Sequence, residues 1–199
     1  MLLYDSAVSG NCYKVRLLLA QLGIDYERQE MDVVDRSNRQ DVIGRERNPA
    51  LRVPTLVLDD GRALGESNAI LWWLGDGTPF VPEDRFERAQ VLQWQFFEQY
   101  DHEPNLAVAR FWLLKRPDEV DPEKLEAWQA GGNRALTAME SHLATRQFLV
   151  GERYSIADIS LYAYTHVAEE GGFDLAGYPA ISGWLKRVAA QPGHVTIGA

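Results

Sequence analysis

The amino-terminal sequence MLLYDSAVSGNCYKVRLLLAQLG (residues 1–23) places a four-residue turn, Ser9-Gly10-Asn11-Cys12, between a strand and a helix. Met1 to Tyr4 is a short apolar run typical of a strand, and apolar residues recur at helical spacing from Lys14 to Leu22. Such a turn directs a side-chain hydroxyl and several backbone N–H groups at one point. Because the unpaired N–H groups at a helix N-terminus carry about half a positive charge, we expect an anion or a thiolate to be stabilised there.

The residues after this helix predict the remainder of a small α/β domain. The expected strands are 24–31, 55–58 and 62–64, with a short helix near 41–44 and a further helix from Ser67 through Leu74. The order is strand, helix, strand, then strand, strand, helix, and it fills residues 1–76. The Gly- and Pro-rich stretch 75–82 is the expected linker.

From residue 84 onward the apolar spacing predicts helices only. Asp121-Pro122 is typical of a helix cap followed by a first-turn proline, and Ser155 to Asp158 of a capping box. Gly131-Gly132 predicts either a kink or the close approach of a neighbouring element. We therefore predict an α/β domain over residues 1–76 followed by an all-α domain over residues 84–199.

Composition excludes several classes of protein. The chain has 199 residues, 46% of them hydrophobic, which suits a soluble globular protein, and its net charge of -9 argues against nucleic acid as a partner. It contains no run of eighteen apolar residues and no signal peptide, so we expect a cytoplasmic protein that does not enter a membrane. A single cysteine excludes an internal disulfide, and the four histidines lack the spacing of metal ligands, so we expect no metal.

Four motifs, in order, resemble those of the cytosolic glutathione transferase family. They are Ser9, Val53-Pro54, Glu66-Ser67 and the capping box from Ser155 to Asp158. The resemblance covers essentially the whole chain, and the serine in the turn is similar to that of bacterial serine-type, theta- or nu-like members. It implies a thioredoxin-like domain with a cis proline at Pro54, a helical second domain, glutathione as co-substrate and a homodimeric detoxification enzyme.

The resemblance implies that the Ser9 hydroxyl is catalytic. The glutathione thiol has a solution pKa of roughly 8.5, and a hydrogen bond donated to the thiolate lowers this value. A shift of about two units corresponds to ~2.7 kcal/mol, within reach of a charge-assisted hydrogen bond. Asn11 could donate a second one through its amide. Alternatively, Ser9 and Asn11 only cap the helix, and the two roles can coexist.

The remaining glutathione contacts are also implied by the family. The backbone of Val53, presented by Pro54, would pair with the cysteinyl unit, and Glu66 with Ser67 would hold the γ-glutamyl end. Arg52 is the expected local cation, and Arg39 could reach the glycyl carboxylate. The alternative for both arginines is a solvated surface charge.

The second domain is expected to form the pocket for an electrophilic, apolar co-substrate. The candidate wall residues are Tyr100, Phe111 and Trp112, and the alternative is that these aromatic residues belong to the core.

The Ser-Gly-Asn-Cys turn keeps only the second cysteine of a Cys-x-x-Cys redox motif. A thioredoxin-type dithiol cycle therefore lacks its attacking thiol, and we expect Cys12 to be a buried structural residue. The alternative is that Cys12 forms a mixed disulfide with glutathione. Three functions stay open: a glutathione transferase, a glutathione-dependent disulfide reductase or peroxidase, and a non-catalytic binding protein that kept the fold.

Overall fold

The computed structural model describes residues 1–199 and divides the chain into two compact units. The first unit contains Met1–Thr78 together with Pro192–Ala199, and the second contains Pro79–Gln191. The carboxyl-terminal segment thus lies in the first unit, although the sequence prediction extended the second domain to residue 199. Tyr13 donates to the carbonyl of Val195 at 2.8 Å, and Arg16 donates to that of Ile197 at 2.5 Å. These two buried side chains of one helix attach the segment to the first unit.

The first unit is built on a mixed four-stranded sheet with the order β2-β1-β3-β4. Its strands are β1 (Leu2–Asp5), β2 (Glu27–Glu30), β3 (Thr55–Val57) and β4 (Ala63–Gly65). Strands β1 and β2 are parallel, whereas β3 is antiparallel to both β1 and β4. This arrangement confirms the predicted thioredoxin-like topology.

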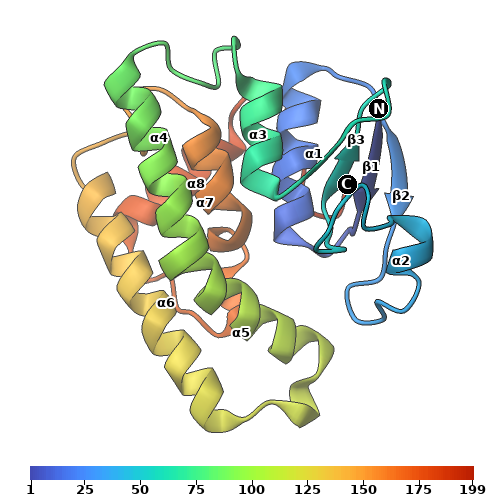
Figure 1. Cartoon of the computed structure of the whole chain (residues 1–199). Coiled ribbons are helices and arrows are strands. Elements are labelled where there is room, and N and C mark those ends of the chain that lie inside the picture. The colour runs from blue at the N-terminus through green and yellow to red at the C-terminus, as the bar shows by residue number, and fades with distance from the viewer. The chain divides into compact units, whose positions relative to one another are not determined.

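Three helices flank this sheet: α1 (Gly10–Leu22), α2 (Arg39–Val42) and α3 (Ser67–Gly75). Helices α1 and α3 lie side by side on one side of the sheet, and α2 lies on the other (Figure 1). Helix α2 begins two residues before the helix expected near 41–44. Val15 and Leu17 to Leu19 of α1 are fully buried, and each buried aliphatic side chain contributes about 1.5–3 kcal/mol.

The second unit contains only helices, as predicted. They are α4 (Arg85–Phe97), η1 (Glu98–His102), α5 (Glu103–Lys115), η2 (Pro117–Glu119), α6 (Pro122–Leu143), α7 (Ile156–Thr165), η3 (Ala168–Gly171) and α8 (Pro179–Ala189). The segment η1 is a single π-helical turn that joins α4 to α5. Every residue of α7 is buried, so this helix forms the centre of the unit. No helix of the structure combines the length and the apolar character that a membrane span requires.

Side-chain caps explain where the main helices of this unit begin. Asp84 accepts from two backbone N–H groups at the start of α4, and Asp121 does the same for α6. The capping box of α7 is present: Ser155 accepts from the N–H of Ala157, and Asp158 accepts from the N–H of Ser155. Asp158 also accepts from Trp184 Nε1 at 2.8 Å, which connects the cap to α8.

Helix α6 is unbroken at Gly131-Gly132, so of the two expectations for this pair the close approach applies. A β-carbon at Gly131 would collide with the side chain of Asn105, and one at Gly132 with the ring of Phe173. The glycines let α5 and the segment after η3 approach α6.

Candidate active site

Ser9 is the N-cap of α1, and its hydroxyl is placed at the helix N-terminus. The half-buried Oγ accepts from the backbone N–H of Cys12 at 3.3 Å, while the backbone of Ser9 stays extended. A hydroxyl oxygen that accepts one hydrogen bond still carries its own proton for donation. The capping role and a donor role toward a bound anion are therefore compatible.

Arg16, which the sequence analysis did not single out, holds the loop that leads into this turn. It pairs with Asp5 at 2.6 Å and donates to the carbonyls of Ser6 and Ala7, both at 3.1 Å. The Arg16 and Asp5 side chains are both buried. A buried ion pair requires good geometry on both partners. Since Arg16 also binds the two carbonyls that follow Asp5, it fixes the path of the chain just before Ser9.

Asn11 connects α1 to the start of α3. Its Oδ1 accepts from Lys14 Nζ at 2.8 Å and from Ser67 Oγ at 3.1 Å, and Lys14 Nζ lies 3.4 Å from Ser67 Oγ. Lys14, on the second turn of α1, is a fully buried cation. Lys14 was not among the predicted site residues, and the one signal for it in the sequence is a cation three residues after Asn11.

Glu66 and Ser67 begin α3. Ser67 is buried, whereas the Glu66 side chain is exposed and its backbone has φ 63 and ψ 113. A non-glycine residue in this region costs about 1–3 kcal/mol, and such strain clusters at binding sites. The structure therefore holds the Glu66 backbone, at the N-terminus of α3, in a strained conformation.

The Val53-Pro54 peptide bond is cis, as the resemblance implied. The buried amide of Asn48 donates to the carbonyl of Arg52 at 3.1 Å and to Thr55 Oγ1 at 2.7 Å, which clamps both ends of the segment. The backbone N–H and carbonyl of Val53 make no hydrogen bond within the protein. They are thus available to an extended peptide, while the Arg52 side chain is exposed beside them.

Arg39 is almost fully buried, and its terminal nitrogens donate to the carbonyls of Leu51 and Asp32, both at 2.9 Å. Burial lowers the pKa of Arg39 from its ordinary value. Leu51 has φ 52, so Arg39 supports a left-handed residue just before Arg52 and Val53. In this structure Arg39 stabilises the loop, and its terminal nitrogens already have acceptors.

Cys12 lies in the first turn of α1 and is fully buried. Desolvation raises the pKa of its thiol far above the ordinary value, and the nearby Asp5 carboxylate raises it further. A thiol in this state is protonated at neutral pH and unreactive as a nucleophile. This supports the structural role expected for Cys12.

The three aromatic residues expected to form a pocket wall differ in exposure. Tyr100, on η1, is 84% exposed, whereas Phe111 and Trp112 on α5 are half-buried. Trp112 stacks on Trp128 of α6 with 6.5 Å between ring centroids. Part of this aromatic set therefore packs within the helical unit.

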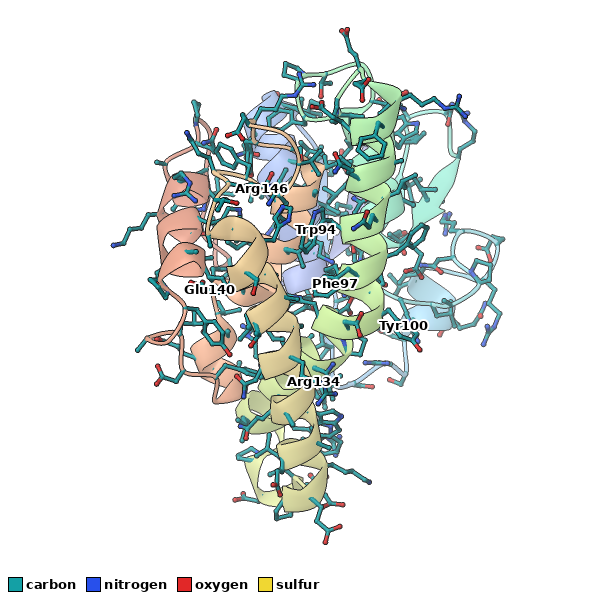
Figure 2. The ribbon with its side chains drawn as sticks, turned by 90° about the vertical axis from the view of Figure 1, so that its left-hand side faces the viewer. Trp94, Phe97, Tyr100, Arg134, Glu140 and Arg146 are labelled. Carbon is teal, nitrogen blue, oxygen red and sulfur yellow. The ribbon has the colours of Figure 1, made fainter.

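Figure 2 shows Trp94, Phe97 and Tyr100 in succession along α4 and η1, opposite α6, which carries Arg134 and Glu140. Trp94 packs edge-on against Phe97 and against His142 of α6, with centroids 5.3 and 4.7 Å apart. These contacts belong to the core of the second unit. A cavity of about 510 Å³ lies between the end of α6 and α8, and it is lined by none of the predicted site residues.

Two family models match the chain. Residues 3–79 match the model of the glutathione S-transferase N-terminal domain, and residues 105–192 match that of the C-terminal domain. A crystal structure of a glutathione S-transferase from Pseudomonas fluorescens is 49% identical, covers 98% of each chain and superposes with a TM-score of 0.94.

Two further proteins with different names are similar to the chain. The disulfide-bond oxidoreductase YfcG of Escherichia coli is 29% identical over 193 residues, which cover 94% of this chain and 89% of that protein. The glutathione transferase URE2P6 of Phanerochaete chrysosporium, solved in complex with oxidized glutathione, is 26% identical. Its TM-score is 0.85, with 96% of this chain and 91% of that chain covered.

Proposed function

The chain belongs to the glutathione S-transferase family, and we propose that it binds glutathione at the Ser9 turn and transfers it to an electrophilic, apolar co-substrate. Glutathione is the co-substrate that the family and the glutathione complex of the Phanerochaete chrysosporium relative support. We place the chain with the bacterial serine-type, theta- or nu-like members because of its Ser9 turn.

Backbone and side-chain groups would hold the tripeptide at three points: its γ-glutamyl end, its cysteinyl unit and its glycyl carboxylate. The N–H groups at the start of α3 and the Ser67 hydroxyl would bind the γ-glutamyl carboxylate, and Glu66 would pair with the amino group. The unpaired N–H and carbonyl of Val53, next to Pro54, would bind the cysteinyl unit as a short antiparallel strand. The exposed Arg52 is the available cation for the glycyl carboxylate. Arg39 stabilises the loop before it by donating to the carbonyl of Leu51.

The Ser9 hydroxyl would then donate to the glutathione sulfur. The thiol loses its proton to solvent, and the thiolate forms the new bond to an electrophilic carbon. Either a leaving group departs from that carbon with its electron pair, or the electron pair of the broken π or C–O bond moves to the neighbouring atom, which then takes a proton from solvent. A charge-assisted hydrogen bond contributes about 1.5–3 kcal/mol, enough to lower the thiol pKa by about one to two units. The observation that carries this proposal is the Ser9 hydroxyl, which caps α1 and keeps its proton for donation.

The proposal is tested by adding glutathione to the purified protein and measuring its melting temperature, then assaying conjugation to an aryl halide. We expect a higher melting temperature and thiol consumption that saturates with glutathione. A protein with an unchanged melting temperature that is not retained on a glutathione column would contradict the proposal. Retention without turnover of any electrophile would instead indicate a binding protein.

A second candidate function is glutathione-dependent reduction of disulfides or peroxides. It is favoured by the similarity to a disulfide-bond oxidoreductase and by the Asn11-containing turn. Because Cys12 is buried and protonated, glutathione would supply both thiols. The first attacks the substrate disulfide, breaks its S–S bond, releases one substrate thiol and forms a mixed disulfide. The second attacks the glutathione sulfur of that mixed disulfide, which gives oxidized glutathione and releases the other substrate thiol. A panel of aryl halide, hydroperoxide and mixed-disulfide substrates separates this reaction from conjugation.

We also propose that the protein is a cytoplasmic homodimer. Leu92, Phe96 and Tyr100 follow one another at a spacing of four residues along α4 and η1, and their exposed fractions are 40%, 69% and 84%. An exposed apolar stripe of this kind is typical of a surface that another protein covers. We propose a second copy of the chain as the partner, because in a two-fold dimer the same apolar stripe of each copy covers that of the other.

A further inference from the structure

Two polar groups, one from α1 and one from α3, donate hydrogen bonds to the Oδ1 atom of Asn11. Lys14 Nζ donates to it at 2.8 Å, and the Ser67 hydroxyl donates to it at 3.1 Å. Lys14 is 0% exposed and Ser67 is 5% exposed. Because a buried side chain has few rotamers open to it, these two residues hold the Asn11 amide in one orientation.

The contact with Lys14 identifies the oxygen and the nitrogen of the Asn11 amide. An ammonium group has three donors and no acceptor, so the Asn11 atom it contacts is the carbonyl oxygen. The NH₂ end, which carries the donors, is therefore the opposite end of the amide. Asn11 is half-buried and lies two residues after Ser9 on the same turn.

We propose that Lys14 is a positioning residue that orients the Asn11 amide as a second hydrogen-bond donor to the glutathione sulfur. This inference rests on the proposed glutathione site. Ser67 donates to Asn11 only before glutathione binds, because its hydroxyl has a single donor. In the complex this donor would form a hydrogen bond with the γ-glutamyl carboxylate. Lys14 keeps its donor on Asn11 throughout, since the ammonium carries three N–H donors.

The test variant is Lys14→Met, which removes the donor and keeps a long unbranched side chain. The apparent pKa of bound glutathione is measured by ultraviolet titration of the thiolate, and its dissociation constant by calorimetry. We expect the thiol pKa to rise by about one unit, a tenfold loss of thiolate below that pKa, with the dissociation constant changed by less than about threefold. Leu18→Met, one turn further along α1 and also buried, is the control and should leave both quantities unchanged.

A double-mutant cycle separates positioning from the charge of Lys14 itself. In an Asn11→Ala background, Lys14→Met should shift the thiol pKa no further. An equal shift in that background, or an unchanged pKa in folded Lys14→Met, would overturn the proposal. Wild-type protein that does not bind glutathione would instead overturn the proposed function.

Asn11→Asp provides a readout that does not depend on the folding of Lys14→Met. The carboxylate still accepts from Lys14 and Ser67 but has no amide donor. The thiol pKa should rise above the wild-type value, and an unchanged pKa would show that the amide does not reach the sulfur.

Discussion

Ser9 is a single residue whose hydroxyl oxygen and hydroxyl proton have separate partners. The oxygen accepts from the Cys12 N–H and caps the N-terminus of α1, and in the proposed function the proton is donated to the ligand. Cys12, three residues later, faces the core, and burial raises the pKa of its thiol. In the proposed function the turn would donate hydrogen bonds to the glutathione sulfur, while burial keeps the chain's own thiol, Cys12, protonated.

Glu66→Ala tests the residue that we assign to the γ-glutamyl end. We expect glutathione affinity to fall about tenfold or more, because a charge-assisted hydrogen bond contributes about 1.5–3 kcal/mol. The pKa of the bound thiol should change little, since Glu66 acts at the other end of the tripeptide. Calorimetry and thiolate titration measure the two quantities, and a shifted pKa with intact affinity would contradict the assignment.

At the scale of the element, α7 depends on one buried carboxylate. Asp158 accepts from the N–H groups of Leu149 and Ser155 and from the indole of Trp184, so it joins the preceding loop, the cap and α8. The sequence pattern predicted the cap. It could not predict the bond to Trp184, because that partner lies 26 residues away in the chain and only folding brings it near.

Asp158→Ala is expected to lower the free energy of unfolding by about 3 kcal/mol or more, because each buried group left without a partner costs about 1–3 kcal/mol. Ser155→Ala is the matched variant and should cost only about 1 kcal/mol, as for other N-cap residues. Urea denaturation measures both. Equal losses for the two variants would show that the contacts outside the cap contribute nothing.

His142 of α6 makes the stability of the helical unit depend on pH. Burial is the main cause that lowers the pKa of His142, while its ring packs against Trp94 and its Nε2 bonds with the carbonyl of Leu149. The folded state therefore takes up a proton less readily than the unfolded chain. This contribution to stability is present above the ordinary histidine pKa of about 6.5 and is lost as pH falls through the lower folded value.

The pH effect is measured by urea denaturation of wild type and His142→Gln between about pH 7 and about pH 5. We expect wild type to lose more stability than the variant on acidification. If the two proteins lose stability in parallel, other groups cause the acid sensitivity.

At the scale of the whole molecule, the exposed stripe on α4 and η1 should be covered by a second copy. Phe96→Glu places a charge in the middle of that stripe and should convert a dimer to a monomer. Light scattering coupled to gel filtration measures the mass. Leu114→Glu, at another exposed apolar position of the same unit, is the control. A wild-type protein that is monomeric, or a variant that remains dimeric, would contradict the proposed interface.

Local patterns were sufficient for the order of elements and for the two-part architecture. Features that depend on neighbours in the sequence could be predicted from it. These are the turn at Ser9, the segment before Pro54 and the caps of α6 and α7. Lys14, Arg16 and Asn48 were missed because their roles depend on partners that only the fold brings together. The attachment of residues 192–199 to the first unit depends on Tyr13, which lies 182 positions from its partner Val195.

The central claim is that Ser9 stabilises the glutathione thiolate, and ultraviolet titration of bound glutathione tests it most directly. The wild-type protein should lower the thiol pKa by about one to two units below the solution value of roughly 8.5. In Ser9→Ala the pKa should return toward that value while the dissociation constant stays nearly unchanged. A titration curve that is the same for both proteins would contradict the claim.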